Sequence, residues 1–153
     1  MDELSLEWNI ENVGSASLVW NFRGEAVKVR TTYVGDGLGS LVQAAIDLRR
    51  GSSSAIAFLP AEPGGNCIFF AGAAEGVYVQ IVSFCDMESE HKRWSGGVLR
   101  WQGSVDTANL ILQVRMLTEA LLERYDTAEL YAGAWQGASF PLEKLEILRD
   151  DNP

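Results

Sequence analysis

Residues 106–125, DTANLILQVRMLTEALLERY, have the spacing of a long amphipathic helix. Leu110, Val114, Leu117 and Leu121 recur every three or four residues and predict one apolar stripe. Four further residues widen this stripe, namely Ile111, Thr118, Leu122 and Tyr125. Since a stripe this wide is suited to covering a sheet rather than to a narrow coiled-coil seam, we expect the helix to lie across one face of a sheet.

The chain before this helix is patterned mainly as strands. Apolar and polar residues alternate from Leu4 to Glu11, and the same period of two continues through Leu18, Trp20 and Phe22 and then from Val27 to Tyr33. Three more strands are predicted at residues 56–59, 67–71 and 77–85, and another around 98–105. In the strand at 27–33, Lys28 and Arg30 point outward, so Glu7 or Glu11 would face a cation across the sheet. Each such pair contributes only about 0.2–1 kcal/mol.

A shorter helix is predicted between these two groups of strands. The spacing of apolar residues changes at Gly35-Asp36-Gly37 from the period of two of a strand to the spacing of a helix. The helix is expected to end at Arg49-Arg50-Gly51, which gives a cationic last turn followed by a terminating glycine. After residue 131 we expect a Gly/Ala-rich loop and then a short closing helix with Pro141 in its first turn. Runs of strands with only two substantial helices favour the α+β class. We therefore predict a single domain over residues 1–153, with an antiparallel sheet of about six or seven strands and two main helices on one face.

Composition narrows the classes of function. The chain has 153 residues, 47% of them apolar, and a formal charge of −9. This charge argues against nucleic acid and anionic membrane surfaces as partners, because both are bound through basic patches. No apolar run approaches the ~18 residues of a membrane span. The start, Met1-Asp2-Glu3-Leu4, lacks the features of a signal peptide, and two cysteines are too few for a disulfide scaffold, so we expect a cytoplasmic protein.

Gly35-Asp36-Gly37-Leu38-Gly39 lies where a phosphate-binding loop would lie, between a strand and a helix. The third glycine of the dinucleotide fingerprint is replaced by Val42, and the lysine of a Walker loop is missing. Asp36 would also face an anionic phosphate. We interpret the glycines as a strand-to-helix turn, with Asp36 near the start of the helix.

Asp86, Glu88, Glu90 and His91 contain the oxygen and nitrogen ligands of a divalent-cation site, but the spacing of an EF-hand is absent. A solvated acidic loop explains them better. Asp86 would raise the pKa of the Cys85 thiol, which argues against a catalytic pair of Cys85 with His91. Cys67 and Cys85 are expected to be too far apart for a disulfide, and both thiols to be buried or inert. We therefore expect no catalytic residue, no metal and no cofactor.

Five tryptophans invite a carbohydrate-binding or base-stacking interpretation. Trp8, Trp20 and Trp101 fall on the apolar phase of predicted strands, so we assign them to the core. Trp135, between two glycines, is expected to plug the end of the sheet. Trp94 follows Lys92-Arg93 in a polar loop and is expected to be exposed.

The distribution of charge is more informative than any motif. Residues 51–91 contain no Lys or Arg, yet they contain five acids. Ordinary solubility is one explanation. The other is a surface complementary to a basic protein, because opposed fields steer association. The partner-binding candidates are these five acids and a neighbouring aromatic residue, namely Glu62, Glu75, Asp86, Glu88, Glu90 and Trp94.

The order of these parts resembles small acidic immunity proteins that are encoded beside polymorphic or contact-dependent bacterial toxins. Four segments carry the resemblance: the strands with Trp8 and Trp20, the junction Tyr33–Gly39, the helix at 106–125, and the closing segment from Trp135 to Leu145. The resemblance implies a cytosolic, non-catalytic protein that binds a cognate toxin domain and blocks its active site or substrate cleft. It carries over no functional residue position by position.

Two other classes of function remain open on the sequence. One is a small-molecule-binding or enzymatic domain whose site is assembled from scattered residues. The other is a structural or assembly module of a larger complex. The sequence leaves the oligomeric state, the toxin and the contact surface open.

Overall fold

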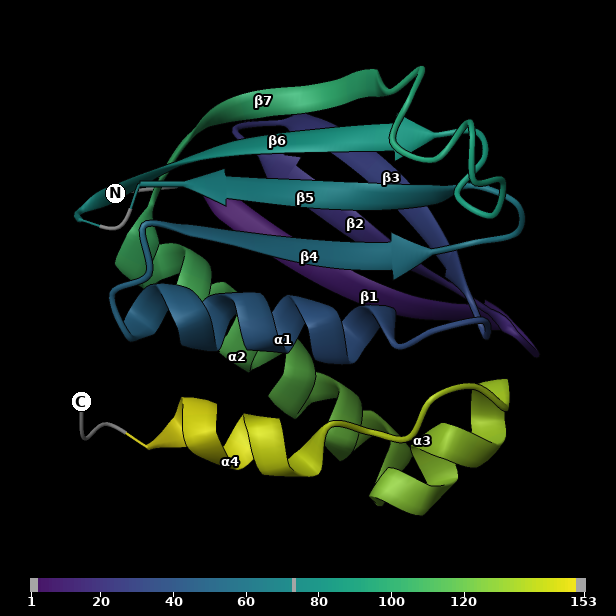
Figure 1. Ribbon diagram of the computed structural model, residues 1–153. Helices are drawn as coiled ribbons and strands as arrows, with labels where there is room; N and C mark the ends of the chain where they lie inside the picture. The colour runs from purple at the N-terminus through teal and green to yellow at the C-terminus, as the bar shows by residue number, and fades with distance from the viewer. Residues whose placement is uncertain (1–2, 73, 151–153) are drawn as a thin grey trace.

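The computed structural model describes residues 3–72 and 74–150 and confirms the α+β class. This part of the chain forms seven strands and four helices, whose arrangement is shown in Figure 1. The strands are β1 (Leu4–Asn12), β2 (Ser15–Phe22), β3 (Glu25–Thr32), β4 (Ser54–Pro60), β5 (Gly65–Ala71), β6 (Gly76–Phe84) and β7 (Val98–Asp106). The helices are α1 (Gly37–Arg49), α2 (Thr107–Tyr125), α3 (Ala128–Trp135) and α4 (Leu142–Arg149).

The seven strands form two antiparallel sheets rather than a continuous one. Sheet A has the order β1-β2-β3 and sheet B the order β4-β5-β6-β7. The sheets lie face to face (Figure 1), and Trp20 of β2 packs against Trp101 of β7 with their ring centroids 5.4 Å apart. Within each sheet, strands that are consecutive in the chain pair with one another, and α1 connects the last strand of sheet A to the first strand of sheet B.

Polar side chains from both sheets join β3 to sheet B. The Asn66 amide donates to the Arg30 carbonyl at 2.8 Å, and the Thr31 hydroxyl donates to the Pro60 carbonyl at 2.7 Å. Arg100 is an extra residue at an irregularity in the pairing of β6 with β7, and its guanidinium donates to the Lys28 carbonyl at 3.3 Å. These contacts satisfy backbone carbonyls that would otherwise lack partners at a sheet edge.

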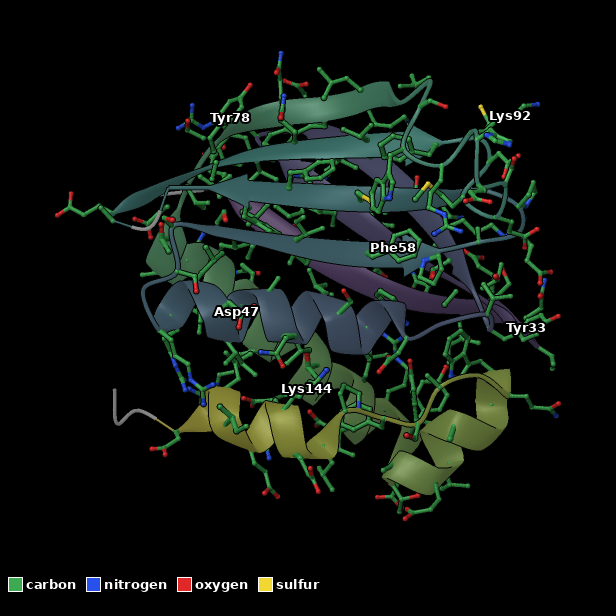
Figure 2. The ribbon with its side chains drawn as sticks, viewed as in Figure 1. Tyr33, Asp47, Phe58, Tyr78, Lys92 and Lys144 are labelled. Atoms are coloured by element: carbon green, nitrogen blue, oxygen red, sulfur yellow. The ribbon has the colours of Figure 1, made fainter. Side chains whose placement is uncertain are left out.

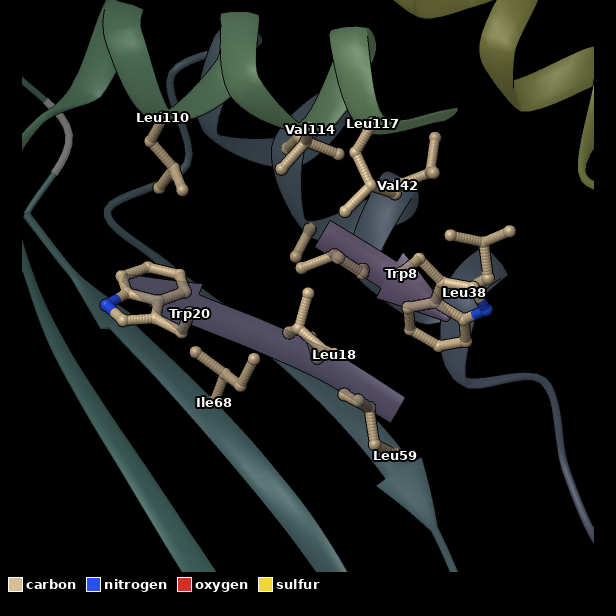
Figure 3. Close-up of a cluster of buried hydrophobic side chains, with 14 of the residues drawn as sticks. Trp8, Leu18, Trp20, Leu38, Val42, Leu59, Ile68, Leu110, Val114 and Leu117 are labelled. Atoms are coloured by element: carbon tan, nitrogen blue, oxygen red, sulfur yellow. The ribbon is translucent and has the colours of Figure 1, made fainter. Parts of the chain in front are cut away.

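The two main helices cover the same side of the paired sheets. Helix α1 lies alongside β4, and α2 packs against β1 and α1. The predicted stripe on α2 is confirmed, because Leu110, Val114, Leu117 and Leu121 are all buried. Figure 3 shows three of these leucine and valine side chains directed toward Leu18 and the other core residues. Asp106 accepts a hydrogen bond from the Asn109 amide at 2.9 Å and begins the helix as its N-cap.

The buried side chains form one contiguous cluster with contributions from both sheets and all four helices. Trp8, Trp20 and Trp101 belong to it, as predicted, and Trp135 is buried as well. Asp36 accepts a hydrogen bond from the Gly39 amide at 2.9 Å and caps α1, as expected for a structural turn. In residues 3–72 and 74–150, no helix is long and apolar enough to cross a bilayer.

Helix α3 was not expected, because the sequence pattern predicted a loop in this region. Thr127 caps its first turn by accepting a hydrogen bond from the Leu130 amide at 3.1 Å. Tyr131 and Trp135 are buried, and the Trp135 carbonyl accepts a hydrogen bond from the Gly14 amide at 2.6 Å. Because Gly133 lowers the helix propensity of this segment, the helix is stabilised by tertiary packing rather than by its local sequence.

Candidate interaction surface

Two connections of sheet B lie side by side at one end of the sheet. They are the β4–β5 turn and the longer β6–β7 loop, and the Met87 amide donates to the Pro63 carbonyl at 2.6 Å between them. A Cβ on Gly64 would lie 2.3 Å from the Phe84 carbonyl oxygen, so the close approach requires glycine. The structure thereby brings together four of the five predicted acids, which we call the acidic end: Glu62, Asp86, Glu88 and Glu90.

Glu75 lies apart from the acidic end. It belongs to the β5–β6 turn, at the opposite end of sheet B. In an antiparallel meander successive turns alternate between the two ends of the sheet, so every second connection shares an end. The predicted set of five acids therefore does not form one cluster, and Glu75 is not part of the candidate surface.

The four acids of the acidic end differ in solvent exposure and in hydrogen bonding. Glu62, Glu88 and Glu90 are exposed, whereas Asp86 is half-buried. Asp86 accepts hydrogen bonds from the Ser89 amide at 2.9 Å and the Glu88 amide at 3.0 Å. The Ser89 amide is the main reason that the pKa of the Asp86 carboxyl lies below its usual value. Asp86 therefore holds the loop in shape, while the three glutamates are available to a partner.

Trp94 is exposed, as predicted, with 53% of its surface accessible. One side of its ring packs edge-on against Phe84 at 5.5 Å between centroids, and Phe58 lies at 6.2 Å. Its backbone has a φ of +65°, which is unusual for a bulky L-residue. The loop thus holds a large aromatic ring at the surface in a defined orientation.

Lys92 and Arg93 precede Trp94 and are both exposed. The acidic end therefore contains four carboxylates against two cations in its own loops. The excess remains negative, and residues 51–91 contain no Lys or Arg. The local field favours a basic partner.

Trp94 lies next to a face of sheet B that turns away from the core. Strand pairing places Phe58, Cys67, Val82 and Leu99 in one row across all four strands, with Ile56 and Phe69 in the next row. We call this surface the outer face of sheet B. Figure 2 shows Phe58 and Tyr78 on it, turned toward the viewer. Ile56 is 53% exposed and Leu99 is 46% exposed.

Sequence reasoning did not predict this apolar outer face. The signal is present at residues 56–59 and 67–71, where apolar residues occupy both phases of the strand instead of alternating with polar ones. Continuous apolar strands are usually buried on both faces. In sheet B the inner face is covered by the rest of the chain, and on the outer face the loop with Trp94 packs on Phe58 and Phe84.

The outer face of sheet A is polar by contrast. The Lys28 ammonium lies 2.7 Å from the Glu11 carboxylate, which confirms the predicted cross-strand pair for this glutamate. The Ser17 hydroxyl also donates to Glu11 at 2.6 Å, and the Arg30 guanidinium donates to the Ser15 hydroxyl at 2.9 Å. Sheet A thus has the surface of an ordinary solvated sheet.

The two cysteines are both free. Cys67 lies in the same row as Phe58 and Val82 but is itself buried, and this burial raises the pKa of its thiol to about 11. Both thiols were expected to be buried or inert, and of the two Cys85 is exposed. Among the residues that the structure describes, no three or more His, Cys, Asp or Glu side chains are placed together to hold an ion.

A hollow of about 520 Å³ lies between the end of α1 and the start of α2, on the side of Glu75. Two polar residues of its lining have structural duties. Asp106 caps α2, and the Arg49 guanidinium donates to the carbonyls of Leu148 and Ile147.

Comparison with known proteins gives one structural neighbour to report. No family model matches the chain, and no curated protein matches it. Among solved structures, a chain of the CdiA-CT/CdiI toxin and immunity complex from Enterobacter cloacae is similar, with a TM-score of 0.47 and 12% sequence identity. The match covers 78% of this chain and 99% of that chain. A likeness at this level does not establish a shared partner or activity.

Proposed function

We propose that this protein is a cytoplasmic immunity protein that binds a cognate toxin domain and blocks its active site or substrate cleft. The observation that carries the proposal is the acidic end, where three exposed glutamates belong to the loop that presents Trp94 and to the turn beside it. An acidic surface suits a toxin with a basic substrate-binding cleft, because it competes there with an anionic substrate. The role is binding, with no catalytic step.

The two parts of the acidic end are expected to act differently. Exposed carboxylates at the margin of an interface mainly accelerate association, and salt screens them. A tryptophan buried by the partner mainly slows dissociation, because it loses contact with water only in the complex. The kinetics of binding therefore separate the glutamates from Trp94.

The first test is co-purification of the tagged protein with the product of the adjacent gene. We expect a toxin that is retained in stoichiometric amount and whose activity is lost in the complex. A neighbouring product that is a metabolic enzyme, or a toxin that is neither retained nor inhibited, would contradict the proposal.

The second test neutralises the acidic end in the triple variant Glu62→Gln, Glu88→Gln and Glu90→Gln, which leaves the Asp86 turn intact. The matched control makes the same change of charge on the helical side, with Glu129→Gln, Glu143→Gln and Glu146→Gln. Stopped-flow association with the toxin is measured at low and high salt. We expect slower association and a flatter salt dependence for the first variant only. Equal effects of the two variants would mean that net charge matters and the acidic end does not.

Trp94→Ala is expected to accelerate dissociation by about 30-fold or more, which corresponds to ~2 kcal/mol. Leu130→Ala, at an exposed apolar position on α3, is the control and should leave dissociation unchanged. Biosensor kinetics at constant salt check both variants. An unchanged dissociation rate for Trp94→Ala would remove this loop from the interface.

A further inference from the structure

The outer face of sheet B continues the surface of Trp94 without a break. The Trp94 ring packs on Phe58 and Phe84, which belong to β4 and β6 of this same face. From there the rows defined by strand pairing extend through Phe69 and Leu99 to the other strands. The exposed tryptophan thus lies at one margin of a broader apolar surface.

This surface has the composition of an interface centre. In the described part of β4–β7, the outward positions between Ser54 and Ser104 carry no charged side chain. Gln80 and Gln102 complete the row of Ile56 and Phe69, and from the next row the Tyr78 hydroxyl donates to the Gln102 amide oxygen. An apolar centre that is poor in charge and rich in aromatic residues, with polar groups around it, is typical of protein–protein contacts.

We propose that the outer face of sheet B is the centre of the contact with the basic toxin domain, whose own apolar patch is bordered by Lys and Arg. This inference rests on the proposed function and extends it from the acidic end to the whole face. The acidic end then lies at the margin of the interface, where its glutamates meet the basic border of the toxin. Trp94 lies between the apolar centre and that margin.

Charge complementarity distinguishes this occupant from a second copy of the chain. Each copy has a formal charge of −9. In a symmetric pair across the outer face, the acidic end of one copy would lie either beside the acidic end of the other or beside its Glu75 turn. Both arrangements place like charges together, and like charges suppress association. A basic partner meets no such repulsion.

The test replaces apolar area without changing charge. The double variant Ile56→Asn and Leu99→Asn alters two half-exposed positions on the outer face, and Leu112→Asn with Leu130→Asn alters two comparably exposed positions on the helices. We expect the first variant to dissociate from the purified toxin at least tenfold faster. Its association rate and salt dependence should stay as in the wild type. The helical variant should match the wild type in all three quantities.

The outcomes distinguish a failure of the outer-face proposal from a failure of the proposed function. If the acidic-end variant associates slowly while Ile56→Asn with Leu99→Asn dissociates like the wild type, the function stands and the outer face is not the contact. If the wild type does not bind the toxin, both proposals fail. Sedimentation equilibrium of the protein alone should show a monomer, because a dimer that the double variant abolishes would assign the face to a second copy. If the double variant does not fold, as judged by circular dichroism, Ile56→Ser alone gives the same comparison.

Discussion

At the scale of single residues, Glu11 is held by two neighbours on the outer face of sheet A. The hydrogen bond from Lys28 is the largest reason that the pKa of the Glu11 carboxyl lies below its usual value, and the hydrogen bond from Ser17 is the next. We expect Lys28→Gln to raise this pKa toward the usual value. Arg30→Gln is the control, since Arg30 acts on Glu11 only through weaker charge attraction. Titration of the carboxyl signals by nuclear magnetic resonance measures both variants.

The sign of the effect on stability follows from the direction of this shift. A carboxyl whose pKa is lower in the folded state stabilises the fold above its unfolded pKa. That stabilisation is lost as the pH falls through the folded pKa. In Lys28→Gln this acid-dependent loss should shrink. An unchanged Glu11 pKa in this variant would mean that the ion pair does not persist in solution.

Single residues also mark the limit of prediction from the sequence. Alternation along the strands indicated that Glu7 or Glu11 would face a cation, and the structure shows Glu11 with Lys28. The exposure of Trp94 followed from its polar neighbours. The contacts of Trp94 with Phe58 and Phe84 did not, because they depend on how a long loop folds back over two strands. The placement of Glu75 away from the other acids was derivable, since consecutive hairpin turns must alternate between sheet ends.

At the scale of elements, α2 offers a direct test of its packed face. Leu117 is 6% exposed and faces the core, whereas Leu112 on the same helix is 47% exposed. Leu117→Ala should cost about 2–5 kcal/mol of unfolding free energy, because it removes buried methyl groups and leaves a cavity. Leu112→Ala should change it by less than about 0.5 kcal/mol. Urea unfolding compares the two variants, and equal costs would refute the assigned orientation of the helix.

The elements also differ in how far their sequences specify them. Helix α2 and the strands of sheet A have strong periodicity, so they were predicted with nearly correct limits. Helix α3 has eight residues and contains Gly133, so its local signal is weak and the burial of Tyr131 and Trp135 decides its structure. The division of the strands into two sheets depends on contacts such as that of Trp20 with Trp101. Such contacts join residues far apart in the chain, and no local pattern contains them.

At the scale of the whole molecule, we expect residues 1–153 to unfold as one unit. The buried cluster includes residues from both sheets and from α1, α2, α3 and α4, so no group of elements keeps a separate core. Small chains with one contiguous core usually unfold in a single cooperative transition. Tryptophan fluorescence reports on the contact between the sheets, and far-UV circular dichroism reports mainly on the helices. The two signals should give the same urea midpoint, and the same should hold in Trp94→Ala, in which the exposed tryptophan no longer contributes. Two separate midpoints would instead mean that parts of the chain unfold independently. The proposed interface would then depend on the stability of sheet B alone.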